Sequence, residues 1–231
     1  MAPRTTVVTA YVPIQNHPRS QREYLALRKQ LYDLPISVMS CDAELDECWL
    51  FRYLCWRKGS PITHSIGDNP QKNSLAYHIV QAQKSEWLHR AAEDNSGPDG
   101  PDVLVWIDCG IFHLPGITGD IIVDFMHRAA FEKAIAIPGC WDRNYTYDDF
   151  QPCWRFCGGV IIVPRPLIMP FDFAMKSEYM RWITLHNHVS WDVNTLSRLE
   201  QVEPRLPIWH YKADHTAEMF TNYQPFGINS H

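Results

Sequence analysis

The sequence predicts an α/β fold in which a mostly parallel central sheet is covered by helices on both faces. Short apolar segments rich in β-branched residues alternate with longer segments whose apolar residues recur at helical spacing. Strands that alternate with helices form parallel sheets with both faces covered. A length of 231 residues suits a single domain of this kind, and no internal repeat or linker interrupts the pattern.

The first elements are marked by turn and cap residues. The β-branched run Thr5–Ile14 predicts a buried strand that ends near a proline. Ser20 can cap a helix over Gln21–Tyr32, which ends before Pro35. The apolar run Ile36–Cys41 then predicts a second strand.

The middle of the chain continues the alternation. Glu44–Trp56 has a helical pattern, and Pro61–Ile66 predicts a third strand. Asn73–Glu93 is the longest helical pattern, with its apolar residues on one side. The loop Asn95–Pro101 separates it from the apolar strand Asp102–Ile111.

The last part of the chain adds three helices and three strands. The amphipathic pattern of Asp120–Glu132 predicts a helix, and Lys133–Ile137 and Val160–Val163 predict strands. A mainly helical segment at Pro166–His186, a short helix at Val193–Gln201 and a final strand at Pro207–Ala213 complete the expected order.

Composition and charge exclude several classes of protein. A hydrophobic fraction of 45% and a charged fraction of 20% are ordinary for a globular chain, so extended disorder is not expected. The formal net charge of −5 argues against broad electrostatic wrapping of nucleic acid. No apolar run approaches the roughly 20 residues of a membrane span, and the N-terminal apolar run is too short for a signal peptide.

Cysteine usage predicts a reducing compartment. The seven cysteines are an odd number and form no CxxC pair. We therefore expect reduced, mostly buried thiols in a cytoplasmic protein. The common nucleotide and hydrolase motifs GxxxxGK(S/T), GxGxxG after the first strand, HExxH and GxSxG are absent.

The strand that ends near Asp108 carries the clearest functional signal. An apolar run through the core is followed by a carboxylate where the strand emerges, and then by Gly110. The carboxyl ends of strands in open α/β sheets form the ligand crevice, and a carboxylate there can hold a divalent cation on a diphosphate. Gly110 would let the backbone approach a ligand. The alternative is an aspartate that caps the following turn.

Four segments in order carry a resemblance to a known family. TVVTAYVPI, Tyr77–Lys84, VWIDCGI and FCGGVII together resemble the bacterial HtrL/YibB-like glycosyltransferases, which are of the GT-A, nucleotide-diphospho-sugar type. The similarity runs in scattered blocks from Thr5 to His215. It implies a GT-A-like domain, a UDP- or other nucleotide-sugar donor, and manganese or magnesium. It also implies that Asp108 occupies an Asp-x-Asp-like position in which Gly110 replaces the second acid.

Two further features fit a donor site. Lys84 falls inside the apolar stripe of its predicted helix, where a diphosphate would be a natural partner; alternatively its stem packs and its amine reaches solvent. In this fold type the first-strand exit, Thr9, Ala10 and Tyr11, would bind the nucleoside. Arg19 and Arg22 could reach phosphate, although we favour a solvated surface for both.

The later half offers a further pair of donor-site candidates, Gly158 and Gly159, and candidates for the acceptor side. Gly158 and Gly159 at a strand start would let a sugar lie against backbone, or else form a bulge or turn. The loop Trp141–Trp154 combines rings with carboxylates, which suits an acceptor surface. Its candidate residues are Trp141, Tyr145, Tyr147, Asp148, Asp149 and Trp154.

Asp192 and two histidines complete the candidates. Asp192 precedes a helix that it could cap, and this fold type places an acid there that can act as general base in an inverting enzyme. His215 follows the last strand, where this fold commonly has a metal ligand, whereas His210 lies mid-strand and resembles a core histidine.

The expected function is metal-assisted transfer of a sugar from a nucleotide-sugar to an acceptor hydroxyl. The donor-binding part would span about residues 5–115 and the acceptor part about 116–231. The acceptor would be a glycan, or a hydroxymethylated base in DNA if the protein acts in a phage-infected bacterial cell. A nucleotidyltransferase and a non-catalytic sugar-nucleotide binder remain alternatives. The former would usually carry a Gly-rich loop where Tyr11 and its neighbours stand.

Overall fold

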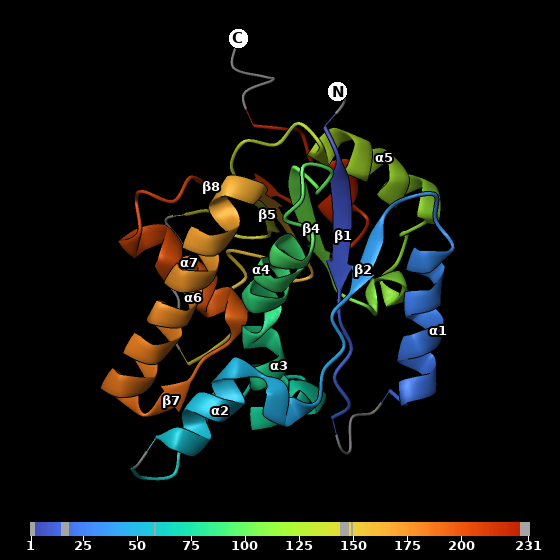
Figure 1. The fold of residues 1–231 in the computed structure, drawn as a ribbon. Coiled ribbons are helices and arrows are strands. Elements are labelled where there is room, and N and C mark those ends of the chain that lie inside the picture. The colour runs from blue at the N-terminus through green and yellow to red at the C-terminus, as the bar shows by residue number, and fades with distance from the viewer. Residues whose placement is uncertain (1–2, 15–18, 58, 144–147, 149, 227–231) are drawn as a thin grey trace.

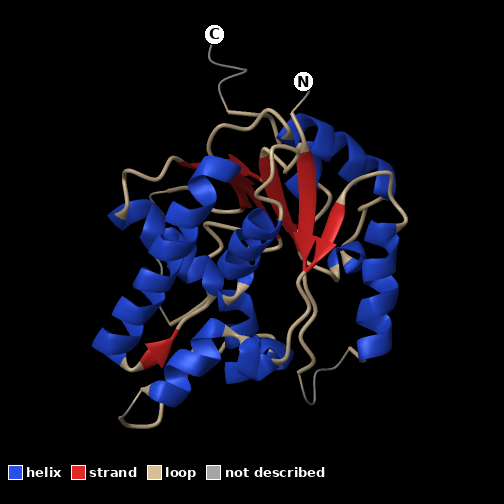
Figure 2. Ribbon diagram, viewed as in Figure 1, coloured by secondary structure: helices blue, strands red, loops and turns tan. Residues whose placement is uncertain are grey.

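A six-stranded sheet forms the centre of the protein (Figures 1 and 2). The computed structural model describes residues 3–14, 19–57, 59–143, 148 and 150–226. Tyr145, Tyr147 and Asp149 of the expected acceptor loop lie outside these residues. The strand order is β2 (Val38–Ser40), β1 (Thr5–Thr9), β4 (Val103–Ile107), β6 (Val160–Pro164), β5 (Ile135–Gly139) and β8 (Ile208–Lys212).

One strand of this sheet runs against its neighbours. β6 is antiparallel to β4 and β5, whereas the pairs β2–β1, β1–β4 and β5–β8 are parallel. The mostly parallel sheet predicted from the sequence is therefore confirmed. Because β6 is reversed, Val160 at its start pairs with Ile107 at the end of β4. The residues just before β6 therefore lie at the edge of the sheet where the parallel strands end.

Both faces of the four central strands are buried, as their continuous apolar runs predict. Successive side chains point to opposite faces, so Leu104 and Trp106 enter one core cluster while Val103, Val105 and Ile107 enter the other. The first cluster takes residues from α2 (Trp49–Trp56), α3 (Leu75–Ala82), α4 (Lys84–Asp94), α6 (Arg165–His186) and α7 (Asp192–Val202). The second takes them from α1 (Gln21–Tyr32), α5 (Gly119–Ala129) and α8 (Glu218–Thr221). Figure 1 shows the two sets on opposite sides of the strands.

Local signals fix several boundaries. Ser20 and Glu23 form the capping box that begins α1, so this helix has its predicted bounds. Three short 3-10 turns, at Leu45–Glu47, Pro70–Lys72 and Ile111–His113, lie in the connections. Among the described residues, no helix is long and apolar enough to cross a membrane.

Two sequence-based expectations are corrected. The long helix expected over 73–93 is two helices, because Gln83 leaves the helical ladder between α3 and α4 and its buried side chain accepts the Trp49 amide. The third strand is only β3 (Thr63–His64), which lies outside the central sheet. It pairs with β7 (His188–Val189), which the sequence did not suggest.

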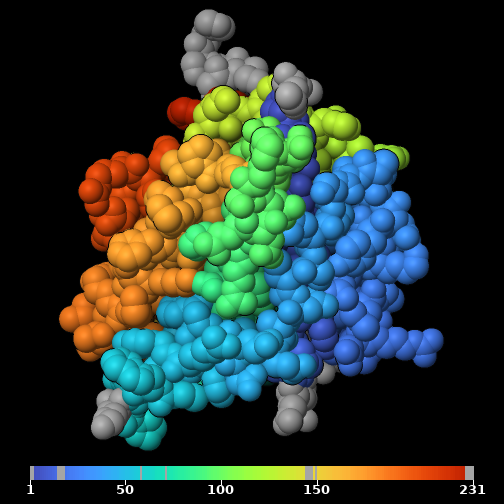
Figure 3. Space-filling view, viewed as in Figure 1, coloured from blue at the N-terminus to red at the C-terminus, as the bar shows by residue number. Residues whose placement is uncertain are grey.

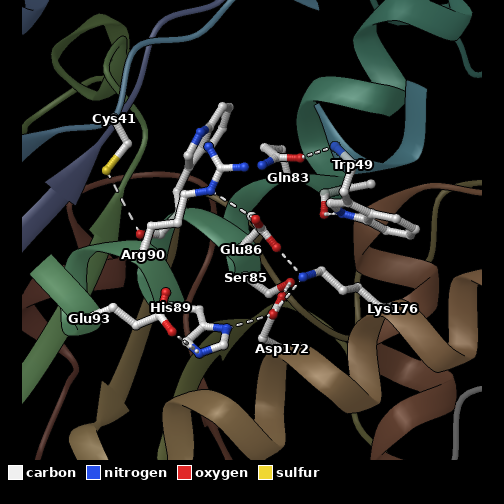
Figure 4. Close-up of polar contacts among 12 residues, drawn as sticks. Cys41, Trp49, Gln83, Ser85, Glu86, His89, Arg90, Glu93, Asp172 and Lys176 are labelled. Carbon is white, nitrogen blue, oxygen red and sulfur yellow. Dashed lines mark hydrogen bonds and ion pairs between the residues drawn. The ribbon is translucent and has the colours of Figure 1, made fainter. Parts of the chain in front are cut away.

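A buried polar network joins α4 to α6 (Figure 4). Asp172 accepts a hydrogen bond from Ser85 at 2.9 Å and from Lys176 at 2.7 Å, and lies 3.0 Å from Nδ1 of His89. Lys176 also contacts Glu86. Figure 3 shows the green segment that includes α4 between the orange segment of α6 and the blue N-terminal segments. The network fixes α4, whose first residue is Lys84.

Candidate active site

Asp108 follows the last residue of β4 and lies at the crevice edge of the sheet. Its side chain is 39% exposed, so it is open to a ligand. The indole Nε1 of Trp106 donates to its Oδ1 at 2.7 Å, and its own amide donates to the Gly159 carbonyl at 3.0 Å. Trp106 is in turn stacked on Trp87, with ring centroids 5.4 Å apart. The bond to Gly159 therefore fixes the backbone of Asp108, and the packed indole of Trp106 fixes its carboxylate.

Lys84 is buried among acidic and carbonyl oxygens. Its Nζ donates to Oδ2 of Asp192 at 2.9 Å and to the Gly158 carbonyl at 2.8 Å, and it lies 3.4 Å from Oδ1 of Asp108. Burial alone would lower the pKa of Lys84, but Asp108 and Asp192 together outweigh it and raise the pKa. The ammonium is thus charged at neutral pH. The burial predicted from the helical stripe is confirmed, and the amine does not reach solvent.

Asp192 is the first residue of α7 and does not occupy the cap position. That position belongs to Trp191, so the interpretation of Asp192 as an N-cap is wrong. The carboxylate turns instead to Lys84, and only 7% of its side chain is exposed. Asp192 still contacts the crevice, because it lines one of the cavities there together with Lys84 and Asp108.

Gly158 is required by close packing at this point. A Cβ atom on Gly158 would lie 2.5 Å from Oδ2 of Asp192 and 3.2 Å from Nζ of Lys84. At Gly159 the nearest atoms to such a Cβ are at 3.6 and 3.7 Å, which is ordinary contact. The two adjacent glycines therefore differ: the first lets the Lys84–Asp192 pair form, and the second has space beside Asp108.

Two adjoining cavities meet at these residues. They have volumes of about 570 and 440 Å³, within the range of small-ligand sites. Both are lined by Lys84 and Asp108, and the other shared residues are Asn69, Lys72, Tyr77, Gln81 and His113. Lys84 and Asp108 therefore stand between two compartments and can contact a molecule in either.

The first cavity lies beside the exit of β1. It is lined by Ala10 and Tyr11, two of the three residues expected at the nucleoside, whereas Thr9 is fully buried and is not among the lining residues. Arg19 also lines it, with its guanidinium 5.7 Å from the centroid of the Tyr24 ring. Arg19 is therefore half-buried at the cavity rather than fully solvated, while Arg22 is exposed as expected.

The second cavity is lined by residues predicted for the donor, the metal and the acceptor. Gly158, Gly159, Asp192 and His215 line it, and so do Trp141 and Trp154 from the expected acceptor loop. His210 is not among the lining residues and bonds through Nε2 to the Gly139 carbonyl at 3.1 Å, as a core histidine would. Asp148 is exposed.

Several cavity residues were not singled out from the sequence. Tyr77 and Gln81 line both cavities together with Lys84. Their spacing of four and seven residues places them on one side of a helical segment, so this polar stripe was a usable signal. Tyr24 and His113 had no comparable signal, because their position depends on how α1 and the turn after β4 pack against the crevice.

Comparisons with known proteins address the fold. No protein-family model matches the chain, and no curated protein matches it. A solved glycosyltransferase involved in the glycosylation of the major capsid of PBCV-1 is similar in structure, with a TM-score of 0.51 and 12% identity over 92% of this chain and 82% of that one. Two others have lower scores. Mouse xyloside xylosyltransferase 1 has a TM-score of 0.42, with 9% identity over 91% of this chain and 85% of that chain. A 4-diphosphocytidyl-2C-methyl-D-erythritol synthase from Anaerococcus prevotii has 0.40, with 10% identity over 97% and 93%.

The protein therefore has a GT-A-like fold, in which a mostly parallel sheet is flanked by helices and its strand ends form a crevice. At 12% identity the likeness extends to the fold and not to the reaction. The resemblance to the HtrL/YibB-like family stays a prediction. What the chain does has to be argued from the crevice itself.

Proposed function

We propose that the protein is a glycosyltransferase that moves a sugar from a nucleotide-diphosphate sugar to an acceptor hydroxyl. The observation that carries the proposal is the position of Lys84 and Asp108 between two adjoining cavities in a GT-A-like crevice. A transferase needs a donor and an acceptor on either side of the bond that breaks. A lysine and a carboxylate reachable from both compartments suit that place.

The first cavity suits the donor. Its lining residues run from Ala10 to His113, so they all fall within the part of the chain, about 5–115, that we assign to donor binding. Tyr11 and Tyr24 offer rings to a nucleobase, with centroids 5.6 Å apart. Arg19 and Lys72 on the same wall offer charge to phosphates.

The residues around Asp108 fit a divalent cation that arrives with the donor. Asp108 and Asp192 with Lys84 have a formal charge of −1, so a cation there is not opposed by the local charge. The contacts of Trp106 and Lys84 are both to Oδ1 of Asp108, and Oδ2 can accept a further ligand. Magnesium is commonly held by one or two carboxylates plus substrate phosphates, and manganese prefers similar oxygen ligands. When bound, such a cation would neutralise the leaving diphosphate.

Asp192 is our proposed general base for an inverting reaction. It lines the second cavity, where the acceptor would lie, and its pairing with Lys84 fixes its orientation. In the proposed step the acceptor oxygen forms the new bond to the sugar carbon while its proton passes to the Asp192 carboxylate. The bond from that carbon to the diphosphate breaks, and the nucleoside diphosphate leaves. Lys84 offsets negative charge that develops beside it.

The finer assignments belong to the same proposal. The HtrL/YibB-like resemblance supports a glycan acceptor, and Trp141 and Trp154 offer rings on which a sugar can stack. All seven cysteines are free, which fits a reaction in the cytoplasm. Residues 116–231 supply the acceptor-side groups Gly158, Gly159 and Asp192, while Lys84 and Asp108 come from the donor part.

Binding and turnover of donors test the proposal directly. Isothermal titration with UDP- and GDP-sugars, each with and without manganese, should show one preferred donor whose affinity rises with the metal. Asp108→Ala should abolish this gain and the slow hydrolysis of that donor, while its far-ultraviolet circular dichroism stays unchanged. The matched control is Asp124→Ala on α5, an exposed acid that lines neither cavity. Full donor turnover by Asp108→Ala would refute the assignment.

A further inference from the structure

Three side chains from distant parts of the sequence meet beyond the ends of three adjacent strands. Cys140 follows β5, Cys157 precedes β6 and His215 follows β8, and these strands are neighbours in the order β6-β5-β8. The two sulfurs lie 3.6 Å apart, and Nδ1 of His215 lies 3.7 Å from Sγ of Cys140 and 3.8 Å from Sγ of Cys157. The ligand atoms of these three residues all lie within 4.8 Å of one another, which is close enough for all three to bind one metal ion.

The three distances match one face of a metal tetrahedron. Zinc binds cysteine sulfur at about 2.3 Å and histidine nitrogen at about 2.0–2.1 Å in tetrahedral geometry. Those bond lengths require about 3.8 Å between two sulfurs and about 3.6 Å between sulfur and nitrogen. The observed triangle, with sides of 3.6 to 3.8 Å, is therefore already the size that a bound ion needs.

The chemistry of the three ligands selects a soft or borderline cation. Thiolate and imidazole favour zinc, whereas manganese and magnesium favour the oxygen ligands offered near Asp108. Cys157 is fully buried, and Cys140 and His215 are half-buried.

We infer that Cys140, Cys157 and His215 bind a zinc ion, at a site separate from the cation proposed at Asp108. Three protein ligands leave the fourth tetrahedral position for water. The site would join the two ends of the segment 141–156, which carries Trp141 and Trp154. Backbone hydrogen bonds already hold the two ends of this segment together, because the Trp154 carbonyl accepts hydrogen bonds from the amides of Cys140 and Trp141 at 2.9 and 3.0 Å. The ion would hold the aromatic wall of the second cavity in place.

Zinc content and ligand spectroscopy test this inference without any assay of activity. The full chain, purified under reductant and incubated with zinc chloride, should retain about one zinc ion after desalting. Cobalt substitution should give the intense thiolate-to-cobalt charge-transfer absorption. Cys140→Ser, Cys157→Ser and His215→Gln should each lower the affinity for zinc by at least about 100-fold, and the two serine variants should weaken the cobalt band. The matched control is Cys153→Ser, since Cys153 is buried in the same segment and its sulfur contacts Ser197.

Two results would overturn the inference. Retention of zinc by the cysteine variants at the wild-type level would place the ion elsewhere. A Cys140–Cys157 disulfide in protein kept under reductant, seen as a mass lower by two hydrogen atoms, would show that the sulfurs pair with each other. Circular dichroism of each variant separates loss of metal from loss of fold. Loss of donor turnover in Asp108→Ala has no bearing on this result.

Discussion

The ammonium of Lys84 lies 2.9 Å from the carboxylate of Asp192, although 108 positions separate them in the sequence. The pair connects the start of α4 with the start of α7 across the crevice. Nζ of Lys84 also donates a hydrogen bond to the Gly158 carbonyl, so three segments of the chain meet at this nitrogen. The crevice is therefore organised around an ion pair that is buried in the protein before any ligand arrives.

Removal of Lys84 should destabilise the fold. Lys84→Met leaves Asp192 buried with no counter-charge from this amine, and breaking a buried pair in this way costs about 3–5 kcal/mol. The free energy of unfolding in urea measures the loss. Asp192→Asn in the same chain should recover part of it. Lys29→Met, which breaks an exposed pair with Asp33, should cost less than about 1 kcal/mol. Equal losses in the two lysine variants would contradict the prediction.

The two adjacent glycines should respond differently to the same substitution. Gly158→Ala forces a Cβ to within 2.5 Å of Asp192, so the Lys84–Asp192 pair has to separate. We expect a lower unfolding midpoint and a loss of sugar transfer of at least about tenfold. Gly159→Ala, with its nearest contact at 3.6 Å, is the matched control for stability and should keep the unfolding midpoint. Similar behaviour of the two variants would show that the packing around Asp192 adapts easily.

Trp106 should position Asp108 through its indole N–H. Trp106→Phe keeps an aromatic ring against Trp87 but removes the 2.7 Å hydrogen bond to Asp108. We expect the manganese concentration for half-maximal donor binding to rise by about tenfold, which corresponds to the roughly 1.4 kcal/mol within reach of one charge-assisted bond. Trp87→Phe, which changes the stack and not the bond, should leave the manganese response unchanged. An unaltered response in Trp106→Phe would make that bond purely structural.

The two carboxylates should separate donor binding from transfer. Asp108→Asn is expected to weaken metal-dependent donor binding, because it removes the charge nearest the proposed cation. Asp192→Asn should keep donor affinity within about threefold and lower the transfer rate by about 10²–10⁴-fold, the usual contribution of a general base. Titration of the donor beside a single-turnover assay distinguishes the two. Loss of donor affinity in Asp192→Asn alone would remove the proposed base from its role.

The free energy of unfolding should decrease as the pH is lowered, because His78 is buried in its neutral form. Burial lowers the pKa of His78 from 6.5 to about 4, so the folded protein keeps it neutral while the unfolded chain takes a proton below about 6.5. Its contribution is complete above pH 6.5 and is lost by about 1.4 kcal/mol per pH unit down to about pH 4. His78→Gln, which can still donate to the Ser65 carbonyl, should flatten urea unfolding midpoints over this range. Parallel curves for the two proteins would contradict the assignment.

Local patterns were sufficient to predict the frame of the site. The apolar run before Asp108 predicts where its strand leaves the core, and the carboxylate stands one residue past β4. Ser20 and Pro35 bound α1 because caps and breakers act over a few residues. The burial of Lys84 also follows from its helical position. Each of these features depends on neighbours in the sequence.

The partners within the site could not be read in this way. The sequence suggested a diphosphate for Lys84, but the structure adds Asp192, which depends on the break at Gln83 and on the packing of α7. The Cys140, Cys157 and His215 group has no recognisable spacing, since it arises from the order of strands in the sheet. Contacts between distant segments are set by tertiary packing, and no local pattern in the sequence marks them.

Because β6 runs against its neighbours, the segment that carries Trp141 and Trp154 can vary independently of the sheet. The segment 141–156 begins just after β5 and finishes just before β6, so both of its ends lie at one edge of the sheet. A segment anchored twice at one edge can be lengthened, shortened or exchanged without moving any strand out of register. A change of the proposed acceptor, by selection or by redesign in the laboratory, can therefore be confined to this one stretch while the groups beside Asp108 stay as they are.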